Sequence, residues 1–511
     1  MIDGIGDRGR AMAARRAGMR EWAGLAVLAL PTLLLSLDLS VLHLAVPQLG
    51  ADLGPGAVEL LWIIDVYGFM IAGFLVPMGT LGDRLGRRRL LLAGAAAFGA
   101  ASACAAFAAT PEALIAARAA MGVAGATLMP STLSLIGTMF RDPRQRGLAI
   151  GVWATTFSAG MALGPVVGGV LLERYWWGSV FLLGVPVMAV LLVAAPLLLP
   201  EHRTASAGRI DALSVVLALA TMLPVTYGFK ELPVTGPRLG AVGAIAAGVL
   251  AGVLFVRRQR RLADPLLDLS LFADRAFRGA LPVLLFGAAS AGGIYLFVTQ
   301  YLQLVEGLSP LESGLWLVPA AVALGVASLA APIVARRVRP AYVIAAALVV
   351  SGAGFLVLTQ ADARSGTVFV VAGLVLVYAG GSPTTALGTD LVVGSAPPER
   401  AGAASAVSET STELGVALGI AALGSVGTAV YRHQDAQGDT LAEAAATAER
   451  LPPALGDDVL APAREAFTMG MNAAAAVCLA LTIALAVLAV KVLGHVRPSG
   501  DAPAAQDAGT S

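Results

Sequence analysis

Residues 37–47 read LDLSVLHLAVP, and residues 60–89 read LLWIIDVYGFMIAGFLVPMGTLGDRLGRRR. Each of these apolar runs carries one carboxylate, Asp38 in the first and Asp65 in the second, and the second run ends in a Gly- and Arg-rich turn at 79–89. A carboxylate within a membrane span is costly and persists where it faces a cavity, a partner or a proton path. Two such acids before a basic turn therefore favour a membrane transporter that exchanges bound protons for its cargo.

The composition agrees with a membrane protein. The chain has 511 residues, of which 57% are hydrophobic and 13% charged, whereas soluble proteins have about 25% charged residues. The net charge of +1 gives no electrostatic case for nucleic-acid binding. Cys104 and Cys478 both fall in apolar runs, which excludes a disulfide framework and a cysteine metal site.

Fourteen apolar runs of roughly 20 residues, the length that crosses a bilayer, follow one another along the chain. They lie near residues 22–48, 58–80, 89–109, 112–140, 147–172, 177–199, 211–230, 238–256, 279–303, 311–335, 341–360, 366–394, 401–430 and 467–491. Most of the 34 basic residues fall on the inner side when the N-terminus is placed inside. The sequence therefore predicts an all-α integral membrane protein with a retained first helix and both termini in the cytoplasm.

A weak internal repeat predicts how these runs are grouped. The turn GTLGDRLGRRR at 79–89 has a degraded echo, AAPIVARRVRP, at 330–340, eight runs later. This offset predicts six helices, two inserted helices and six more, the repeated halves of many transporters. The predicted segments are a cytoplasmic tail at 1–21, a six-helix bundle at 22–199, two inserted helices with cytoplasmic linkers at 200–277, a second bundle at 278–493 and a disordered cytoplasmic tail at 494–511.

The second bundle contains a long extracytoplasmic loop at 431–465. Its segment LAEAAATAERL has helix propensity and some apolar spacing, which predicts an interfacial or surface helix. A role of this helix in gating the outer mouth is the alternative.

Three ionisable residues, Asp38, Asp65 and Arg118, are predicted at similar depth in the first bundle. An arginine in lipid is costly, so Arg118 should face the interior and find an acid; a static ion pair is the alternative to a functional role. A carboxylate that is balanced between burial and a nearby cation can titrate near neutral pH, as a proton-coupled cycle requires. All three are therefore candidate proton- or substrate-binding residues.

The thirteenth run adds two acids, Glu409 and Glu413, which share one helical face because they are four residues apart. Such a pair could hold a proton, a cationic drug, or both. The alternative is that both lie in water near the inner mouth.

Two glycine motifs predict close helix packing and a conformational gate. The segment GMALGPVVGG at 160–169 combines glycines four apart with a helix-bending proline, Pro165. The turn at 79–89 allows a tight reversal, and Asp83 could cap the next helix or form an ion pair that breaks in another state; a mere positive-inside anchor is the alternative. The candidate motif residues are Gly160, Gly164, Pro165, Gly168 and Gly169, and the candidate gate residues are Gly79, Gly82, Asp83, Arg84, Gly86, Arg87 and Arg88.

Aromatic residues and one histidine could also serve the cavity. His43 is expected to pack as a buried neutral residue, with a proton relay as the alternative. Most aromatic residues, Trp153, Phe157 and Tyr295 among them, are expected in packing or in the interfacial belt, and a few could stack on a cationic drug.

Together these motifs resemble the major facilitator superfamily. The turn at 79–89 resembles its inner-loop signature, GMALGPVVGG resembles the fifth-helix signature of its drug antiporters, and LDLSVLHLAVP resembles the first-helix signature of drug:proton antiporters. The number of apolar runs, fourteen, resembles that of the fourteen-helix branch of this family, which includes quaternary-ammonium and dye exporters. Met121 stands where the fourth-helix signature usually has glutamine, and the tenth span has no acid beyond Glu312 at its outer end, which argues against high turnover of dications.

The resemblance implies a major facilitator fold of two six-helix bundles plus two inserted helices. It implies a monomeric multidrug efflux transporter in a bacterial cytoplasmic membrane, which exchanges protons for lipophilic, often cationic compounds. By position, Asp38, Asp65, Arg118, Glu409 and Glu413 match the family's intramembrane charges. A dedicated exporter of one antibiotic or metabolite is the alternative, and a proton-driven importer a weaker one. The sequence contains no motif for an enzyme, a metal or a cofactor.

Overall fold

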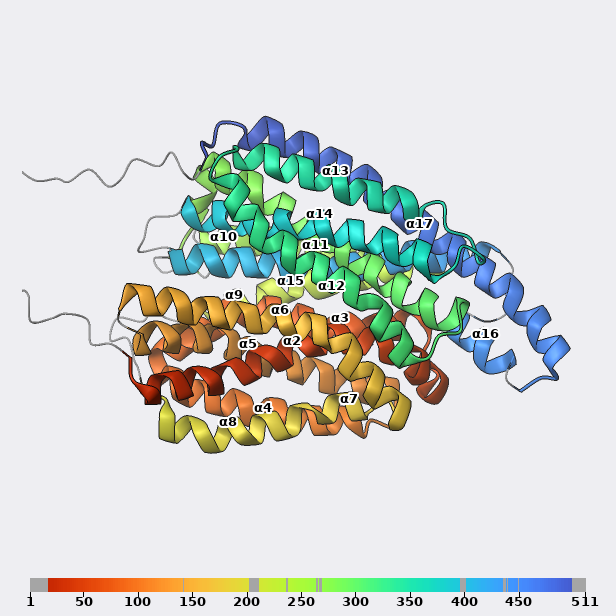
Figure 1. Cartoon of the computed structure of the whole chain (residues 1–511), viewed down its shortest axis with the longest axis horizontal. Coiled ribbons are helices and arrows are strands. Elements are labelled where there is room, and N and C mark those ends of the chain that lie inside the picture. The colour runs from red at the N-terminus through yellow and green to blue at the C-terminus, as the bar shows by residue number, and fades with distance from the viewer. Residues whose placement is uncertain are drawn as a thin grey trace, which may run out of the picture.

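The structure is a computed structural model, and it describes residues 17–140, 142–201, 211–235, 238–262, 265, 269–395, 401–434, 438, 440–448 and 450–498 (Figure 1). Every regular element among these residues is a helix, and none is a strand. Most of the two predicted tails, at 1–21 and 494–511, lies outside the described residues.

The helices follow one another with short connections. They are α2 (Met19–Leu53), α3 (Ala57–Leu85), α4 (Arg87–Ala106), α5 (Pro111–Met139), α6 (Pro143–Arg174), α7 (Ser179–Leu182), α8 (Gly184–Leu198), α9 (Ala212–Thr235), α10 (Leu239–Gln259), η1 (Leu269–Ala273), α11 (Arg275–Gln300), η2 (Tyr301–Val305), α12 (Pro310–Ala335), α13 (Pro340–Leu358), α14 (Thr367–Gly394), α15 (Ala401–His433), α16 (Leu441–Ala448) and α17 (Pro453–Leu493).

Each of the fourteen predicted runs contains a helix. Among the described residues, twelve helices are long and apolar enough to cross a membrane, and α6 makes thirteen if its two arms, bent by 41°, count as one span. The remaining predicted span, the seventh along the chain at 211–230, corresponds to α9, whose apolar part, Ala212–Gly228, is shorter. The chain is therefore a multi-pass membrane protein of the predicted fold class.

The helices form two layers in Figure 1, with α2–α8 below and α11–α14 and α17 above. We call α2–α8 the first half and α11–α17 the second half. The halves meet where α3 packs against α15, α6 against α12 and α2 against α11. The inserted helices α9 and α10 pack against each other, and α9 also reaches α3 and α15, so it lies along the seam between the halves.

Candidate functional site

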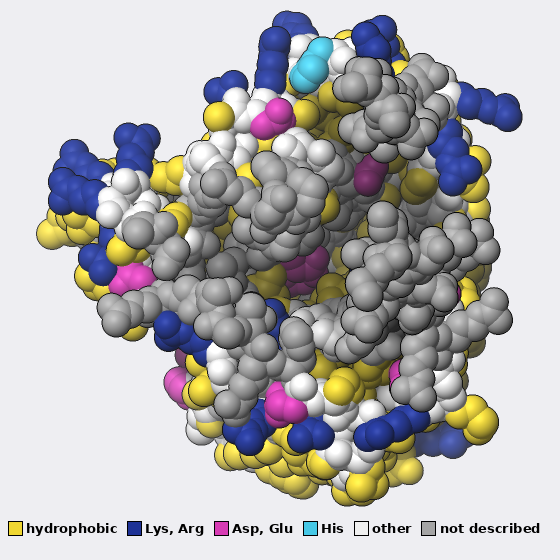
Figure 2. Space-filling view, turned by 90° about the vertical axis from the view of Figure 1, so that its left-hand side faces the viewer, with side chains coloured by type: hydrophobic (Ala, Val, Ile, Leu, Met, Phe, Trp, Pro, Cys, Tyr) yellow, Lys and Arg dark blue, Asp and Glu magenta, His cyan; other side chains and the backbone are white. Residues whose placement is uncertain are grey.

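A cavity of about 540 Å³ lies between the two halves. Its walls come from α2, α3, α5 and α6 on one side and from α11, α12, α14 and α15 on the other. Figure 2 shows the end of the molecule at the left of Figure 1, where a hollow holds acidic side chains and Lys and Arg side chains gather around it. A space of this size and position suits a small-molecule ligand.

Glu409 and Glu413 line this cavity from α15, together with Thr412 between them. Both acids are partly exposed, and neither has an ion-pair partner among the described residues. An ideal Cβ on Gly68 of α3 would lie 3.9 Å from Glu413 Oε2, so α3 passes close to this acid. Two carboxylates one turn apart in a largely apolar cavity favour the binding of a proton or a cation.

Arg118 forms a buried ion pair with Asp38. Its Nη1 donates to Asp38 Oδ2 at 2.6 Å, and the exposed fractions of the two side chains are 2% and 9%. The remaining donors of Arg118 bond to α3, Nε to the carbonyl of Ile63 at 3.2 Å and Nη2 to that of Ile64 at 3.3 Å. Three helices of the first half, α2, α3 and α5, are therefore joined through one guanidinium group.

The structure brings four of the five predicted charged residues to one cavity. Asp65, Arg118, Glu409 and Glu413 all line it, whereas Asp38 lies behind its wall and reaches it through Arg118. Asp65 is 2% exposed and sits on α3 next to Ile64, whose carbonyl accepts from Arg118. The roles of these residues as proton or substrate sites stay a prediction.

The glycine motif of α6 packs against both halves. Ideal Cβ atoms on Gly160 and Gly164 would overlap Ser36 and Ser40 of α2, and one on Gly168 would lie 2.7 Å from Val41. On the other side, a Cβ on Gly169 would lie 2.6 Å from the Cα of Leu311 in α12. Side chains at these positions would hold the helices apart.

The proline of this motif explains the bend of α6. The bend lies between the arms Leu148–Met161 and Leu163–Arg174. Pro165 has no N–H to donate to the carbonyl of Met161, so the helix loses a hydrogen bond at this point. The carbonyl of Pro165 faces Gly314 of α12, where an added Cβ would overlap it.

The turn at 79–89 joins α3 to α4 with a glycine in a left-handed conformation. Gly86 has φ 108°, which L side chains rarely adopt. A Cβ on Gly82 would lie 3.0 Å from Cδ of Arg87, and one on Gly79 would only touch Pro130 at 4.0 Å, while Arg84 is exposed. The side chain of Asp83 lies outside the described residues, so its predicted pairing is not described.

Arg88 of this turn binds the end of α8. Its backbone N–H donates to Glu201 Oε1 at 3.2 Å, and its Nη1 donates to the carbonyls of Pro196 and Leu199 at 3.3 and 2.9 Å. Glu201 is not among the residues that the sequence predicts for this site. A single acid directly after an apolar run, at the same membrane edge as a basic turn, could have indicated such a contact.

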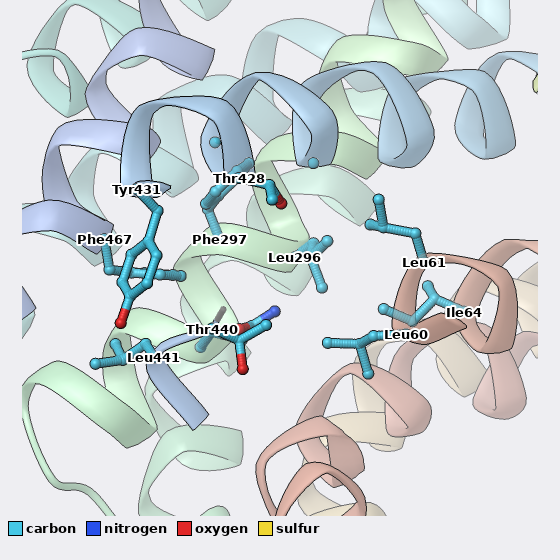
Figure 3. A pocket seen from close by; sticks show the side chains of 13 residues that line it. Leu60, Leu61, Ile64, Leu296, Phe297, Thr428, Tyr431, Thr440, Leu441 and Phe467 are labelled. Atoms are coloured by element: carbon cyan, nitrogen blue, oxygen red, sulfur yellow. The ribbon is translucent and has the colours of Figure 1, made fainter. Parts of the chain in front are cut away.

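At the end of the molecule remote from the hollow, the two halves are in contact. A small pocket of about 70 Å³ lies there, with Leu60, Leu61 and Ile64 of α3 facing Phe297, Tyr431 and Phe467 of the second half (Figure 3). Thr440 and Leu441, at the start of α16, complete it. Ile64 lines both this pocket and the large cavity, so it lies between the two spaces.

Comparison with known proteins agrees with this architecture. A sequence model of the Major Facilitator Superfamily matches residues 28–420. The multidrug efflux pump LfrA of Mycolicibacterium smegmatis is 43% identical over 92% of this chain and 96% of its own length. The methyl viologen resistance protein SmvA of Salmonella typhimurium is 33% identical, over 92% of this chain and 97% of its own. The tetracenomycin C resistance and export protein of Streptomyces glaucescens is 32% identical, over 79% of this chain and 76% of its own length.

Solved structures show the same fold. A bacterial homolog of the human lysosomal transporter Spinster, in an inward-facing conformation, superposes with a TM-score of 0.68 at 16% identity, covering 96% of this chain and all of that one. The sequence match, the relatives and the fold agree, and this chain belongs to the Major Facilitator Superfamily.

Proposed function

We propose that this chain is a multidrug efflux transporter that exports lipophilic, often cationic compounds in exchange for protons. The observation that carries the proposal is the cavity between the halves with Glu409 and Glu413 on its wall. Its largely apolar lining suits a lipophilic compound, and its uncompensated acids suit a positive charge. The relatives that are named as multidrug efflux or resistance proteins support the same function.

In the mechanism we propose, the open end of the cavity admits a cation from the cytoplasm. The cation displaces a proton from the carboxylate pair, because one site cannot hold both at full occupancy. The halves then rock, so that the contacts of α3 with α15 and of α6 with α12 open and the other end closes. A proton that enters from outside neutralises the pair, releases the cation and returns the carrier.

The first half supplies the second set of charges in this cycle. Asp65 lines the cavity from α3, and Asp38 is held by Arg118, whose guanidinium also binds the α3 backbone beside Asp65. A change of protonation at Asp38 would free Arg118 and loosen the contact between α2, α3 and α5. The ion pair would then link proton binding to the movement of the first half.

We also propose a location and an orientation in the membrane. The protein would lie in a bacterial cytoplasmic membrane as a monomer, with both termini and the basic face of Figure 2 in the cytoplasm, as the positive-inside rule requires. It would act as a transporter and not as an enzyme. The relative named as a tetracenomycin C resistance and export protein supports the alternative of a dedicated exporter of one antibiotic.

Expression in a pump-deficient bacterial host tests the proposed function. A panel of lipophilic cations, neutral antibiotics and polar nutrients is compared with and without the protein. We expect resistance to several unrelated lipophilic cations, with lower cellular accumulation that a protonophore abolishes. Resistance to one compound alone would favour the dedicated exporter, and increased accumulation of a nutrient would favour an importer.

A further inference from the structure

Two glycines on the cavity wall are not required by helix packing. Gly381 of α14 and Gly287 of α11 both line the large cavity. An ideal Cβ on Gly381 would meet no heavy atom within 4 Å, and one on Gly287 would meet only Thr384 Cγ2 at 3.8 Å. Gly292, also on the wall, differs, because its Cβ would lie 2.9 Å from Val416. Since glycine weakens a helix interior relative to alanine, the open space itself is what Gly381 and Gly287 preserve.

Two tyrosines stand next to this open wall, on the same two helices. The rings of Tyr295 in α11 and Tyr378 in α14 are stacked, with centroids 6.0 Å apart and planes at 20°. Tyr378 lies three residues before Gly381, so the two share a helical face and the glycine leaves space beside the ring. Both rings line the cavity, and aromatic faces favour stacking with flat rings and cations.

His43 of α2, in the first half, completes the group that the two tyrosines form in the second half. Its ring meets that of Tyr295 edge-on, at 5.1 Å and 86°. The side chain is 5% exposed and lines the cavity, and its Nδ1 has no hydrogen-bond partner among the described residues. A buried polar atom without a partner is costly, so a polar group of a bound ligand would satisfy it.

Helix α6 contributes Trp153, Phe157 and Met161 to the wall of the cavity. These large side chains belong to the first half, whereas the glycine positions belong to the second. A flat ring system would therefore lie between a bulky wall and an open one, with Glu409 and Glu413 as a separate, charged part of the same cavity.

We propose that Tyr295, Tyr378, His43 and Gly381 form a subsite for the flat aromatic ring system of a substrate, separate from the acids that hold its charge. This inference rests on the proposed function, because it names the ligand class of the same cavity. Gly381 determines how wide a ring system the subsite accepts, and His43 binds a polar substituent at the ring edge.

Binding to the purified full-length protein in detergent tests the subsite. The probes are ethidium, a flat aromatic cation, and dodecyltrimethylammonium, an aliphatic one. Gly381→Leu should lower the ratio of ethidium affinity to dodecyltrimethylammonium affinity roughly tenfold, the size of one lost aromatic contact. Gly325→Leu is the matched control, because Gly325 of α12 also has open space at its Cβ position but does not line the cavity. Tyr378→Ala should lower the same ratio, and Tyr378→Phe, which keeps the ring, should restore it.

The subsite would be overturned if the ratio of ethidium affinity to dodecyltrimethylammonium affinity stayed unchanged in both Gly381→Leu and Tyr378→Ala. An equal loss of affinity for both probes is such an outcome. Absence of ethidium binding to the wild-type protein would overturn it as well. Selective ethidium binding without export from cells would support the subsite and contradict the proposed function, so the two failures are distinguishable.

Discussion

Gly50 of α2 and Ala442 of α16 face each other across the two halves, where an ideal Cβ on Gly50 would lie 3.3 Å from the Cβ of Ala442. Helix α16 packs mainly on α17 of its own half, and its buried face includes Leu441, Ala442 and Ala444. The sequence predicts an interfacial or surface helix here, and the structure adds that this helix touches α2 of the first half and that its first residue, Leu441, lines the pocket of Figure 3.

A disulfide across this contact should stop transport. The Cβ separation is close to the roughly 3.8 Å that a disulfide needs, so Gly50→Cys with Ala442→Cys should cross-link in a chain whose Cys104 and Cys478 are replaced. Since this end must open to release cargo, we expect oxidation to abolish export and a reductant to restore it.

The matched control joins α16 to its own half. A Cβ on Gly456 would lie 3.7 Å from that of Ala448, so Gly456→Cys with Ala448→Cys should also cross-link. Because both residues move with the second half, this bond should leave export intact. Full export by the oxidised Gly50→Cys/Ala442→Cys protein would show that α2 and α16 do not separate during transport.

Asp38→Asn should abolish proton-driven export while the protein still reaches the membrane. The amide keeps the size of the carboxylate but loses its charge, so Arg118 is left buried without a counter-ion. Breaking a buried ion pair costs roughly 3–5 kcal/mol, and the carbonyl oxygen of the amide reduces this by accepting one hydrogen bond. We expect a lower Tm in detergent beside the loss of export, and partial recovery of both in Asp38→Glu. Normal export by well-expressed Asp38→Asn would remove Asp38 from the cycle.

Arg258 of α10 binds Asp211 at the start of α9 through two hydrogen bonds, of 2.6 and 2.8 Å. The hydrogen bonds from Arg258 lower the pKa of Asp211 from 3.8 to about 2. Because the folded-state pKa lies below the unfolded one, the pair stabilises the protein above pH 4 and loses its effect as the pH falls towards 2. The pair is partly exposed, so solvent screens it and its contribution to stability is small.

Asp211→Asn should therefore lower the Tm by a small amount that is constant between pH 8 and about 5 and shrinks only below about 4. Thermal unfolding of both proteins across this range measures the difference. A difference that already disappears between pH 7 and 5 would show that another group, and not Asp211, titrates.

The two ends of α13 test the orientation. Arg337 precedes this helix and Arg364 follows it, and both are exposed. In a cysteine-free background, Arg364→Cys should react with a membrane-impermeant maleimide on intact cells, and Arg337→Cys only after permeabilisation. The opposite pattern would invert the proposed topology.

The sequence predicts the helices well and their partners poorly. Apolar length and basic loops locate all fourteen runs because the bilayer imposes both. The need of Arg118 for an acid was also predictable, but the choice of Asp38 over Asp65 depends on how α2, α3 and α5 rotate against one another. The same holds for Gly314 opposite Pro165 and for Tyr378 against Tyr295, since each pair joins helices distant in sequence.

Glu409 and Glu413 are expected to matter more for cations than for neutral drugs. A cation gains from a carboxylate in low dielectric, whereas a neutral compound gains mostly from apolar burial. Glu409→Gln and Glu413→Gln should weaken cation binding by roughly ten- to a hundredfold, the equivalent of one charged contact of about 1.5–3 kcal/mol. If one acid is the proton carrier, its Gln variant should lose both classes of substrate together.

Uptake into everted membrane vesicles tests proton-coupled export through this acid pair most directly. The vesicle interior is made acidic, and uptake of a lipophilic cation and of a neutral drug is measured for the wild-type protein and for Glu409→Gln and Glu413→Gln at matched expression. We predict that the wild-type protein accumulates the cation only while the pH gradient lasts, and that each variant loses more cation uptake than neutral-drug uptake, or loses both together. Wild-type uptake of cation and neutral drug alike by both variants would contradict the proposed role of the acid pair.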